Sequence, residues 1–216
     1  MARIDITPRL TILQVKPDGP DFTFTAGQYT VLGLLGGAAR IPESRPEDAP
    51  GEATEKMIKR AYSISSGSVT REYVEFYVAL VSDGALTPRL FALHGGDRIF
   101  IGARAKGMFT IDKVPDGQNV LMVATGTGVA PYISMLRSQA LGRPQRRIAI
   151  LHGASYSWDL GYRNELEEMA SRCRGFAYAP VRTVDAEAPL WIAIHANDAM
   201  ISDIPPGLGG PMAHQY

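Results

Sequence analysis

Residues 119–131, NVLMVATGTGVAP, decide the fold: a continuous apolar run leads into a glycine-rich turn and then toward a helix. Residues 119–124 predict a buried strand, and residues 130–139 predict the helix. Further along, the pattern predicts a strand at 147–152, a helix at 163–173 and a strand at 176–184. Strands that alternate with helices in this way predict a parallel sheet covered on both faces.

The turn Gly126-Thr127-Gly128 is the sharpest local motif of this half. A glycine-rich turn between a strand and a helix lets backbone N–H groups approach a pyrophosphate at the positive end of the helix. Pro131 suits the first turn of that helix, but it stands where the third glycine of a GxGxxG motif would be. Taken alone, the motif is equally consistent with a tight structural turn.

Toward the N-terminus the pattern changes to short strands, predicted at 9–16, at 22–35 with a turn at Ala26-Gly27, at 73–81 and at 98–104. One short helix is expected at 87–94, with Thr87 as N-cap and Pro88 at its first position. Residues 36–55 predict a loop or disordered excursion. Several short strands with turns predict a closed antiparallel barrel. The turn cluster at 114–117 divides the chain into domains 1–115 and 116–216.

The stretch Arg60-Ala61-Tyr62-Ser63 holds a second motif. On an extended strand, Arg60 and Tyr62 share one face and lie about 6 to 7 Å apart. The arginine is then placed to bind a phosphate while the tyrosine stacks on a ring. The alternative is a surface strand with a half-buried tyrosine.

Composition narrows the function classes. Lysine plus arginine and aspartate plus glutamate number 22 each, so nothing indicates nucleic-acid binding. The single cysteine, Cys173, excludes an internal disulfide, and the spacing of the four histidines gives no local metal motif. No apolar run is long enough to span a membrane and no signal peptide is visible, so a cytoplasmic location is expected.

These motifs together resemble the ferredoxin-NADP(+) reductase family in its bacterial, flavodoxin/ferredoxin-reducing form. The matching stretches occur in family order over about residues 5–184: AGQY (26–29), RAYSISS (60–66), EFYVALV (75–81), SDGALTPRL (82–90), AKGMF (105–109), ATGTGVAPYISML (124–136) and LHGASYSWDLGYRNELEEM (151–169). The pair of RxYS and GTGxxP is far more specific than either motif alone.

The resemblance implies two domains, an antiparallel β-barrel that binds FAD and an α/β parallel-sheet domain that binds NAD(P). On this basis Arg60 would pair with the FAD pyrophosphate, Tyr62 would stack on the isoalloxazine and Ser63 would approach its N5. Other FAD contacts are expected from two segments and from the C-terminal residue: Phe76, Tyr77 and Val78; Gly84, Ala85, Leu86 and Thr87; and Tyr216 as a lid on the flavin.

On the coenzyme side, Thr127 would lie closest to the flavin edge, which makes Tyr62, Ser63 and Thr127 the expected catalytic residues. The expected NAD(P) contacts are Gly126, Thr127, Gly128, Pro131, Ser155 and Arg182. Bacterial NADP-using relatives carry an arginine in the segment where this chain has Ser155. Arg182 lies near another phosphate-binding arginine position of the family, but one residue out of register with it. NADPH is therefore favoured only weakly over NADH.

The implied activity is transfer of a hydride from NAD(P)H to FAD and then of single electrons to ferredoxin or flavodoxin. The alternative is a flavin-binding electron-transfer or interaction subunit that does not oxidise NAD(P)H.

The chain departs from the family pattern after about residue 184, where the nucleotide-binding domain is shortened. Only five residues, 185–189, precede the next apolar run at 190–194, too few for a parallel crossover. His195 stands where the family has a cysteine.

Overall fold

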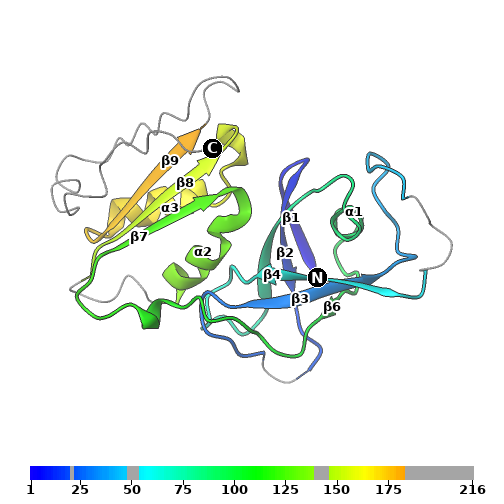
Figure 1. The fold of residues 1–216 in the computed structure, drawn as a ribbon, viewed down its shortest axis with the longest axis horizontal. Coiled ribbons are helices and arrows are strands. Elements are labelled where there is room, and N and C mark those ends of the chain that lie inside the picture. Colours follow the sequence, from blue (N-terminus) through cyan, green and yellow to red (C-terminus); the bar gives the residue numbers. More distant parts are fainter. Residues whose placement is uncertain (20–21, 48–53, 139–145, 183–216) are drawn as a thin grey trace, which may run out of the picture.

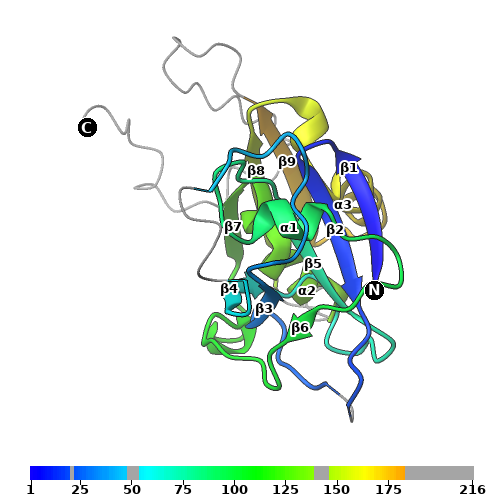
Figure 2. The same ribbon diagram turned by 90° about the vertical axis from the view of Figure 1, so that its right-hand side faces the viewer.

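The computed structural model describes residues 1–19, 22–47, 54–138 and 146–182. Its first half contains two three-stranded antiparallel sheets, which lie on the right in Figure 1 and face the viewer in Figure 2. One has the strand order β1-β2-β5, from β1 (Ala2–Thr7), β2 (Leu10–Val15) and β5 (Val74–Ala79). The other has the order β4-β3-β6, from β4 (Met57–Ser63), β3 (Tyr29–Leu35) and β6 (Phe100–Ile101).

The two sheets enclose one apolar core. Leu13, Leu32 and Phe76 are fully buried in it. An isolated bridge between Ile64 and Phe76 connects the end of β4 to β5. The expected antiparallel β-barrel architecture is confirmed.

Local boundaries differ from the prediction. β1 was not expected: most of its residues are exposed, and it forms by pairing with β2 in the register Ile4 to Ile12. The strand predicted to start at residue 22 starts at Tyr29, after the turn at Ala26-Gly27. Residues 36–47 form a loop held in place by arginines, since Arg89 donates hydrogen bonds to both oxygens of Glu47 at 2.8 Å.

The predicted N-cap of the short helix is wrong. Helix α1 (Thr87–Phe91) has Leu86 in the N-cap position and proline in its first turn. The Thr87 hydroxyl instead accepts a hydrogen bond from the Val81 N–H at 2.9 Å and donates one to the Val81 carbonyl at 3.0 Å. A hydroxyl engaged on both sides by the preceding turn is not left over to cap a helix.

The second half forms the expected parallel sheet, in the order β7 (Val120–Thr125), β8 (Ile148–Ala154) and β9 (Phe176–Arg182). The helices α2 (Ala130–Arg137) and α3 (Arg163–Arg172) connect these strands. Ile133 of α2 and Leu166 of α3 are both fully buried in a cluster with Met122 and Ile150 of the sheet.

Within the described part of the chain, both helices cover the same face of this sheet (Figure 1). On the opposite face, Leu121 and Val123 are 58% and 57% exposed. The expected cover on both faces is therefore not found among these residues. The predicted C-terminal features (the end of the strand at 183–184, the short connection at 185–189, the run at 190–194, and His195 and Tyr216) lie outside the described residues, as does Gln139 at the end of the predicted helix.

The two halves pack directly on each other. Leu10, Ile12 and Tyr77 of the barrel belong to the same buried cluster as Ile133 and Met135 of α2. The Tyr77 ring meets the Tyr162 ring edge-on, with 5.2 Å between the centroids. Its hydroxyl donates to the Asp159 carbonyl at 3.3 Å and accepts from the Gly161 N–H at 3.1 Å. A side chain at Gly161 would collide with this tyrosine, because its Cβ would lie 2.2 Å from the phenolic oxygen.

A polar network continues this interface beside the apolar contacts. Arg137 donates to both oxygens of Glu165 at 2.7 Å, to the Glu75 carboxylate at 2.6 Å and to the Ser65 carbonyl at 3.2 Å. The Tyr162 hydroxyl lies 2.9 Å from Glu75 Oε1 and 3.0 Å from Ser65 Oγ. The second half of the RAYSISS stretch is thus buried beneath the parallel-sheet half of the molecule. None of the described helices is both long and apolar enough to cross a membrane.

Candidate active site

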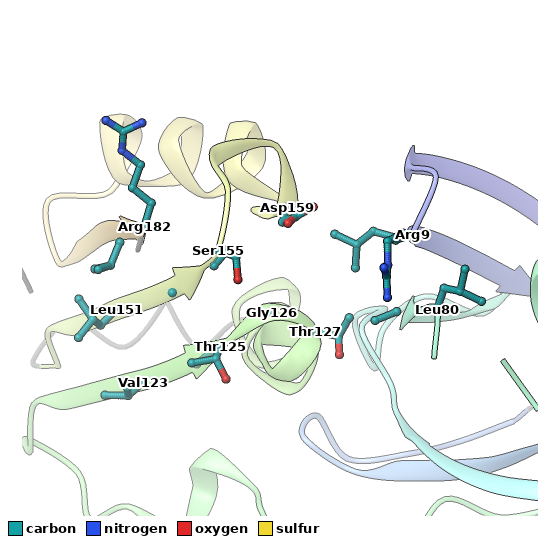
Figure 3. Close-up of a pocket in the computed structure, with 16 residues that line it drawn as sticks. Arg9, Leu80, Val123, Thr125, Gly126, Thr127, Leu151, Ser155, Asp159 and Arg182 are labelled. Carbon is teal, nitrogen blue, oxygen red and sulfur yellow. The ribbon is translucent and has the colours of Figure 1, made fainter. Parts of the chain in front are cut away.

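A cleft of about 480 Å³ lies where the carboxyl ends of β7, β8 and β9 face the barrel (Figure 3). The barrel wall comes from the turn between β1 and β2 and from the end of β5. The sheet wall comes from the strand ends and the turns that follow them. The lining residues are Arg9, Leu10, Ala79, Leu80, Val123, Ala124, Thr125, Gly126, Thr127, Leu151, Gly153, Ala154, Ser155, Asp159, Val181 and Arg182. The carboxyl edge of a parallel sheet is the usual place for a ligand in α/β proteins.

The glycine-rich turn forms the middle of this wall. Residues Gly126–Val129 make one 3₁₀ turn that leads directly into α2, and Pro131 lies in the first turn of that helix. Gly126 has φ +50°, a left-handed backbone conformation that residues with a side chain rarely adopt. Apart from the neighbouring residues of its own turn, a Cβ at Gly126 or at Gly128 would meet no atom of the described residues within 4 Å. The turn therefore offers an open approach to its backbone groups.

His152 of β8 fixes this turn from inside. Its fully buried ring lies between the Gly126 carbonyl, 3.0 Å from Nε2, and the Tyr178 hydroxyl, 3.2 Å from Nδ1. A neutral ring protonated at Nε2 satisfies both partners. Burial lowers the pKa of His152, and the hydrogen bond to Gly126 opposes this only in part. The histidine is thus a neutral support for the glycine turn.

The structure brings four of the six expected coenzyme residues to the cleft: Gly126, Thr127, Ser155 and Arg182. Gly128 and Pro131 follow in the turn and helix but do not line it. In Figure 3 the Ser155 hydroxyl faces the cleft, whereas the Arg182 side chain extends away from the labelled residues of β7 and β8. Sequence reasoning did not identify Arg9 and Asp159, which carry the other charges at the cleft.

The expected flavin residues of β4 are accessible. Arg60 is exposed, and its only hydrogen bond among the described residues goes to the carbonyl of its neighbour Lys59 at 2.8 Å. Tyr62 and Ser63 are half-buried. Burial raises the pKa of Tyr62 to about 12, although the Arg60 charge opposes the rise, so the phenol is neutral at ordinary pH. In the register between β3 and β4, Arg60 lies opposite Leu32 and Tyr62 lies opposite Thr30. The two residues are two positions apart on β4 and therefore share one face of the strand.

Most of the other expected flavin residues, in β5 and before α1, have buried side chains. Phe76, Val78 and Leu86 are buried in the barrel core, and Tyr77 is buried between the domains. Their side chains are therefore packing groups. The Thr87 hydroxyl is bound to Val81, while Gly84 and Ala85 remain half-exposed. Tyr216 lies outside the described residues, and those residues contain no cluster of three or more potential metal-binding acids, histidines or cysteines.

Comparison with known proteins shows which proteins this chain is similar to. The oxidoreductase NAD-binding domain matches residues 122–214. The flavodoxin/ferredoxin-NADP reductases of Shigella flexneri and Escherichia coli K12 are each 36% identical over 159 residues, which cover 72% of this chain. The chain spans little more than half, 56%, of the length of either relative.

Solved structures agree with this relationship. A ferredoxin NADP+ reductase from Neisseria gonorrhoeae, crystallised with bound FAD and NADP, superposes with a TM-score of 0.67 at 26% identity, covering 87% of this chain and 67% of that one. A cytochrome P450 reductase from Amycolatopsis gives a TM-score of 0.66, also at 26% identity, over 84% of this chain and 50% of its own.

Proposed function

Because the chain belongs to the ferredoxin-NADP reductase family, we propose that it is an FAD-dependent oxidoreductase that oxidises NAD(P)H and delivers single electrons to ferredoxin or flavodoxin. One observation carries the proposal: the open glycine turn lies in a cleft that faces the barrel at the carboxyl edge of the parallel sheet. We propose the division at residue 115 as the boundary between the flavin and coenzyme domains.

The exposed face of β4 fits the flavin. Arg60 is free to bind the FAD pyrophosphate through paired N–H groups, and Tyr62, two residues along the same strand face, supplies a rigid aromatic surface for the ring system. Ser63 follows with a hydroxyl suited to hydrogen bonding at the reactive edge. The half-exposed backbone at Gly84 and Ala85 provides the remaining contacts, while Phe76, Tyr77, Val78, Leu86 and Thr87 support the site by packing or through Val81.

The cleft fits the coenzyme. The backbone of Gly126 and Thr127 receives the phosphates, Thr127 holds the nicotinamide end beside the flavin, and Ser155 faces the adenosine end. When bound, FAD and the nicotinamide supply the redox chemistry, and the protein supplies distance and orientation. Tyr62, Ser63 and Thr127 are the residues we propose to touch the reacting rings.

Coenzyme choice follows from charge. Since Ser155 carries no charge and Arg182 extends away from the cleft, neither of these two residues aims an arginine fork at a 2′-phosphate. NADPH is proposed as the coenzyme on family grounds, and NADH is expected to compete effectively. The ferredoxin or flavodoxin partner and a cytoplasmic location belong to the same proposal.

The test is an anaerobic titration of the FAD-loaded protein with NADPH and then NADH, following the flavin absorbance. Loss of the oxidised flavin bands supports the proposal, and the relative rates rank the coenzymes. Bound FAD that neither coenzyme reduces would instead identify a flavin-binding electron-transfer subunit.

A further inference from the structure

Arg9 combines a hydrogen-bonded backbone with a cationic side chain that lines the cleft. It lies in the two-residue turn between β1 and β2, where its N–H donates to the Thr7 hydroxyl at 3.2 Å and its carbonyl accepts from the Leu80 N–H at 2.8 Å. The neighbouring Leu10 is 6% exposed and is packed in the core between the domains. The guanidinium, in contrast, makes no hydrogen bond or ion pair that involves the described residues. Within the described part of the chain, the Arg9 charge therefore has no partner, while its backbone is held in place by hydrogen bonds.

This cation belongs to the barrel but lines the cleft of the other domain. Figure 3 shows Arg9 entering from the barrel side, opposite the strand ends of β7 and β8 and near the labelled Thr127. The glycine turn offers its backbone from one wall, and Arg9 offers N–H donors from the other. An anion held at the turn would thus meet an arginine across the cleft.

The charges around the cleft single out Arg9. Only two cationic residues line it in the described chain, Arg9 and Arg182, and the Arg182 side chain extends away from the strand ends. The one acidic lining residue, Asp159, projects into the same region as Arg9 in Figure 3, yet the two form no ion pair within 4.0 Å. Arg9 is therefore the cation available to an anionic ligand.

We propose that Arg9 binds the diphosphate of the dinucleotide coenzyme from the barrel side and determines the affinity of the cleft for ligands that contain this group. The inference rests on the proposed function, since it assigns one contact of the coenzyme site. Arginine suits the task because its planar fork of donors matches phosphate oxygens. Asp159 opposes the same ligand through its negative charge.

Calorimetric binding to the FAD-loaded chain tests the contact without requiring electron transfer. ADP-ribose carries the diphosphate without nicotinamide or 2′-phosphate, and 2′-AMP carries a 2′-phosphate without the diphosphate. We expect Arg9→Gln to weaken ADP-ribose binding about tenfold or more, and to leave the affinity for 2′-AMP unchanged. Arg9→Lys should recover part of the loss, and Asp159→Asn should tighten ADP-ribose binding.

The matched control is Arg71→Gln, which removes the same charge from an exposed residue outside the cleft and should not alter either affinity. Three results would each overturn the proposed contact. Arg9→Gln could bind ADP-ribose as tightly as the unsubstituted protein does, or the unsubstituted protein could fail to bind ADP-ribose. The affinity could also fall equally in Arg71→Gln, or equally for 2′-AMP. The protein could also bind ADP-ribose in an Arg9-dependent way while NADPH fails to reduce its flavin. That result would support the contact and contradict the proposed reductase function.

Discussion

The guanidinium of Arg137, at the end of α2, forms an ion pair with the carboxylate of Glu75 in β5, with 2.6 Å between Nη1 and Oε1. The Glu75 side chain is only 4% exposed, so the charge has little access to water. Gln14 satisfies its second oxygen at 3.0 Å, and Arg137 also holds Glu165. A single arginine thus connects the barrel to two elements of the nucleotide-binding domain.

Removal of this arginine should destabilise the whole molecule. Arg137→Gln leaves Glu75 as a buried carboxylate without its cation, and we expect a loss of roughly 3 to 5 kcal/mol in the free energy of unfolding. Denaturant unfolding measures the change. As a control, Arg163→Gln breaks an exposed pair with Glu167 and should cost less than about 0.5 kcal/mol. Equal effects in the two variants would contradict the role of the buried pair.

The same carboxylate predicts acid sensitivity. Burial raises the pKa of Glu75, but Arg137, with hydrogen bonds from Gln14 and Tyr162, outweighs burial and lowers it overall. A lowered folded pKa means that the stabilisation is complete above the unfolded value of about 4.3 and is lost as pH falls through the folded pKa. Unfolding free energies measured down to pH 3 should converge for the unsubstituted protein and Glu75→Gln. Curves that stay parallel would exclude this linkage.

His152 predicts a separate pH effect at higher pH. Its pKa is lowered by burial, so the neutral ring stabilises the fold fully above about pH 6.5, and this stabilisation is lost as pH falls from there toward the folded pKa. The stability difference between the unsubstituted protein and His152→Gln should shrink between pH 7 and pH 5. Glu75→Gln provides the comparison, because its own difference should not yet change in that range.

Arg60 is expected to govern flavin affinity. Arg60→Gln removes the donors proposed for the FAD pyrophosphate and should raise the Kd for FAD by roughly tenfold or more, measured by fluorescence of released flavin. Lys59→Gln is the matched control, because Lys59 is the adjacent residue on the other strand face, with its ammonium 4.2 Å from the centre of the Phe100 ring. A similar loss of FAD affinity in both variants would show that positive charge in general, and not a specific contact of Arg60, governs FAD binding.

A cation introduced at Ser155 should alter coenzyme preference. Ser155 is exposed at the cleft and carries no charge, so Ser155→Arg adds a fork for a 2′-phosphate. We expect the ratio of NADPH to NADH affinity to rise about tenfold, measured by competition binding. Ser171→Arg adds the same charge on α3, outside the cleft, and should leave the ratio unaltered.

Much of the fold could be predicted because its signals are local. The apolar run before Gly126 and the glycine turn itself specify a strand followed by a helix whatever the rest of the chain does. β1 could not be predicted, because its mostly exposed residues become a strand only by pairing with β2. The N-cap prediction for Thr87 was wrong because the local sequence favours an N-cap, whereas in the fold the Thr87 hydroxyl is hydrogen-bonded to Val81.

The candidate site shows the same division. Motifs indicated Arg60, Tyr62 and Thr127 through residue type and spacing, and the resemblance assigned their roles. The interdomain contact of Tyr77 has no sequence signal, because its ring is buried against Tyr162 only where the two domains meet. Arg9 likewise has no sequence signal, since its importance depends on which cleft the turn between β1 and β2 faces.

The Tyr77 contact with Gly161 limits how such a protein can be recombined. Because the glycine leaves space for a phenol contributed by the other domain, neither partner is interchangeable alone. A chimera that exchanged the coenzyme half for that of a relative would have to carry over a matching tyrosine and glycine, or the two modules would meet with a steric clash or a void. The two domains are therefore exchangeable only together with the residues of their shared interface.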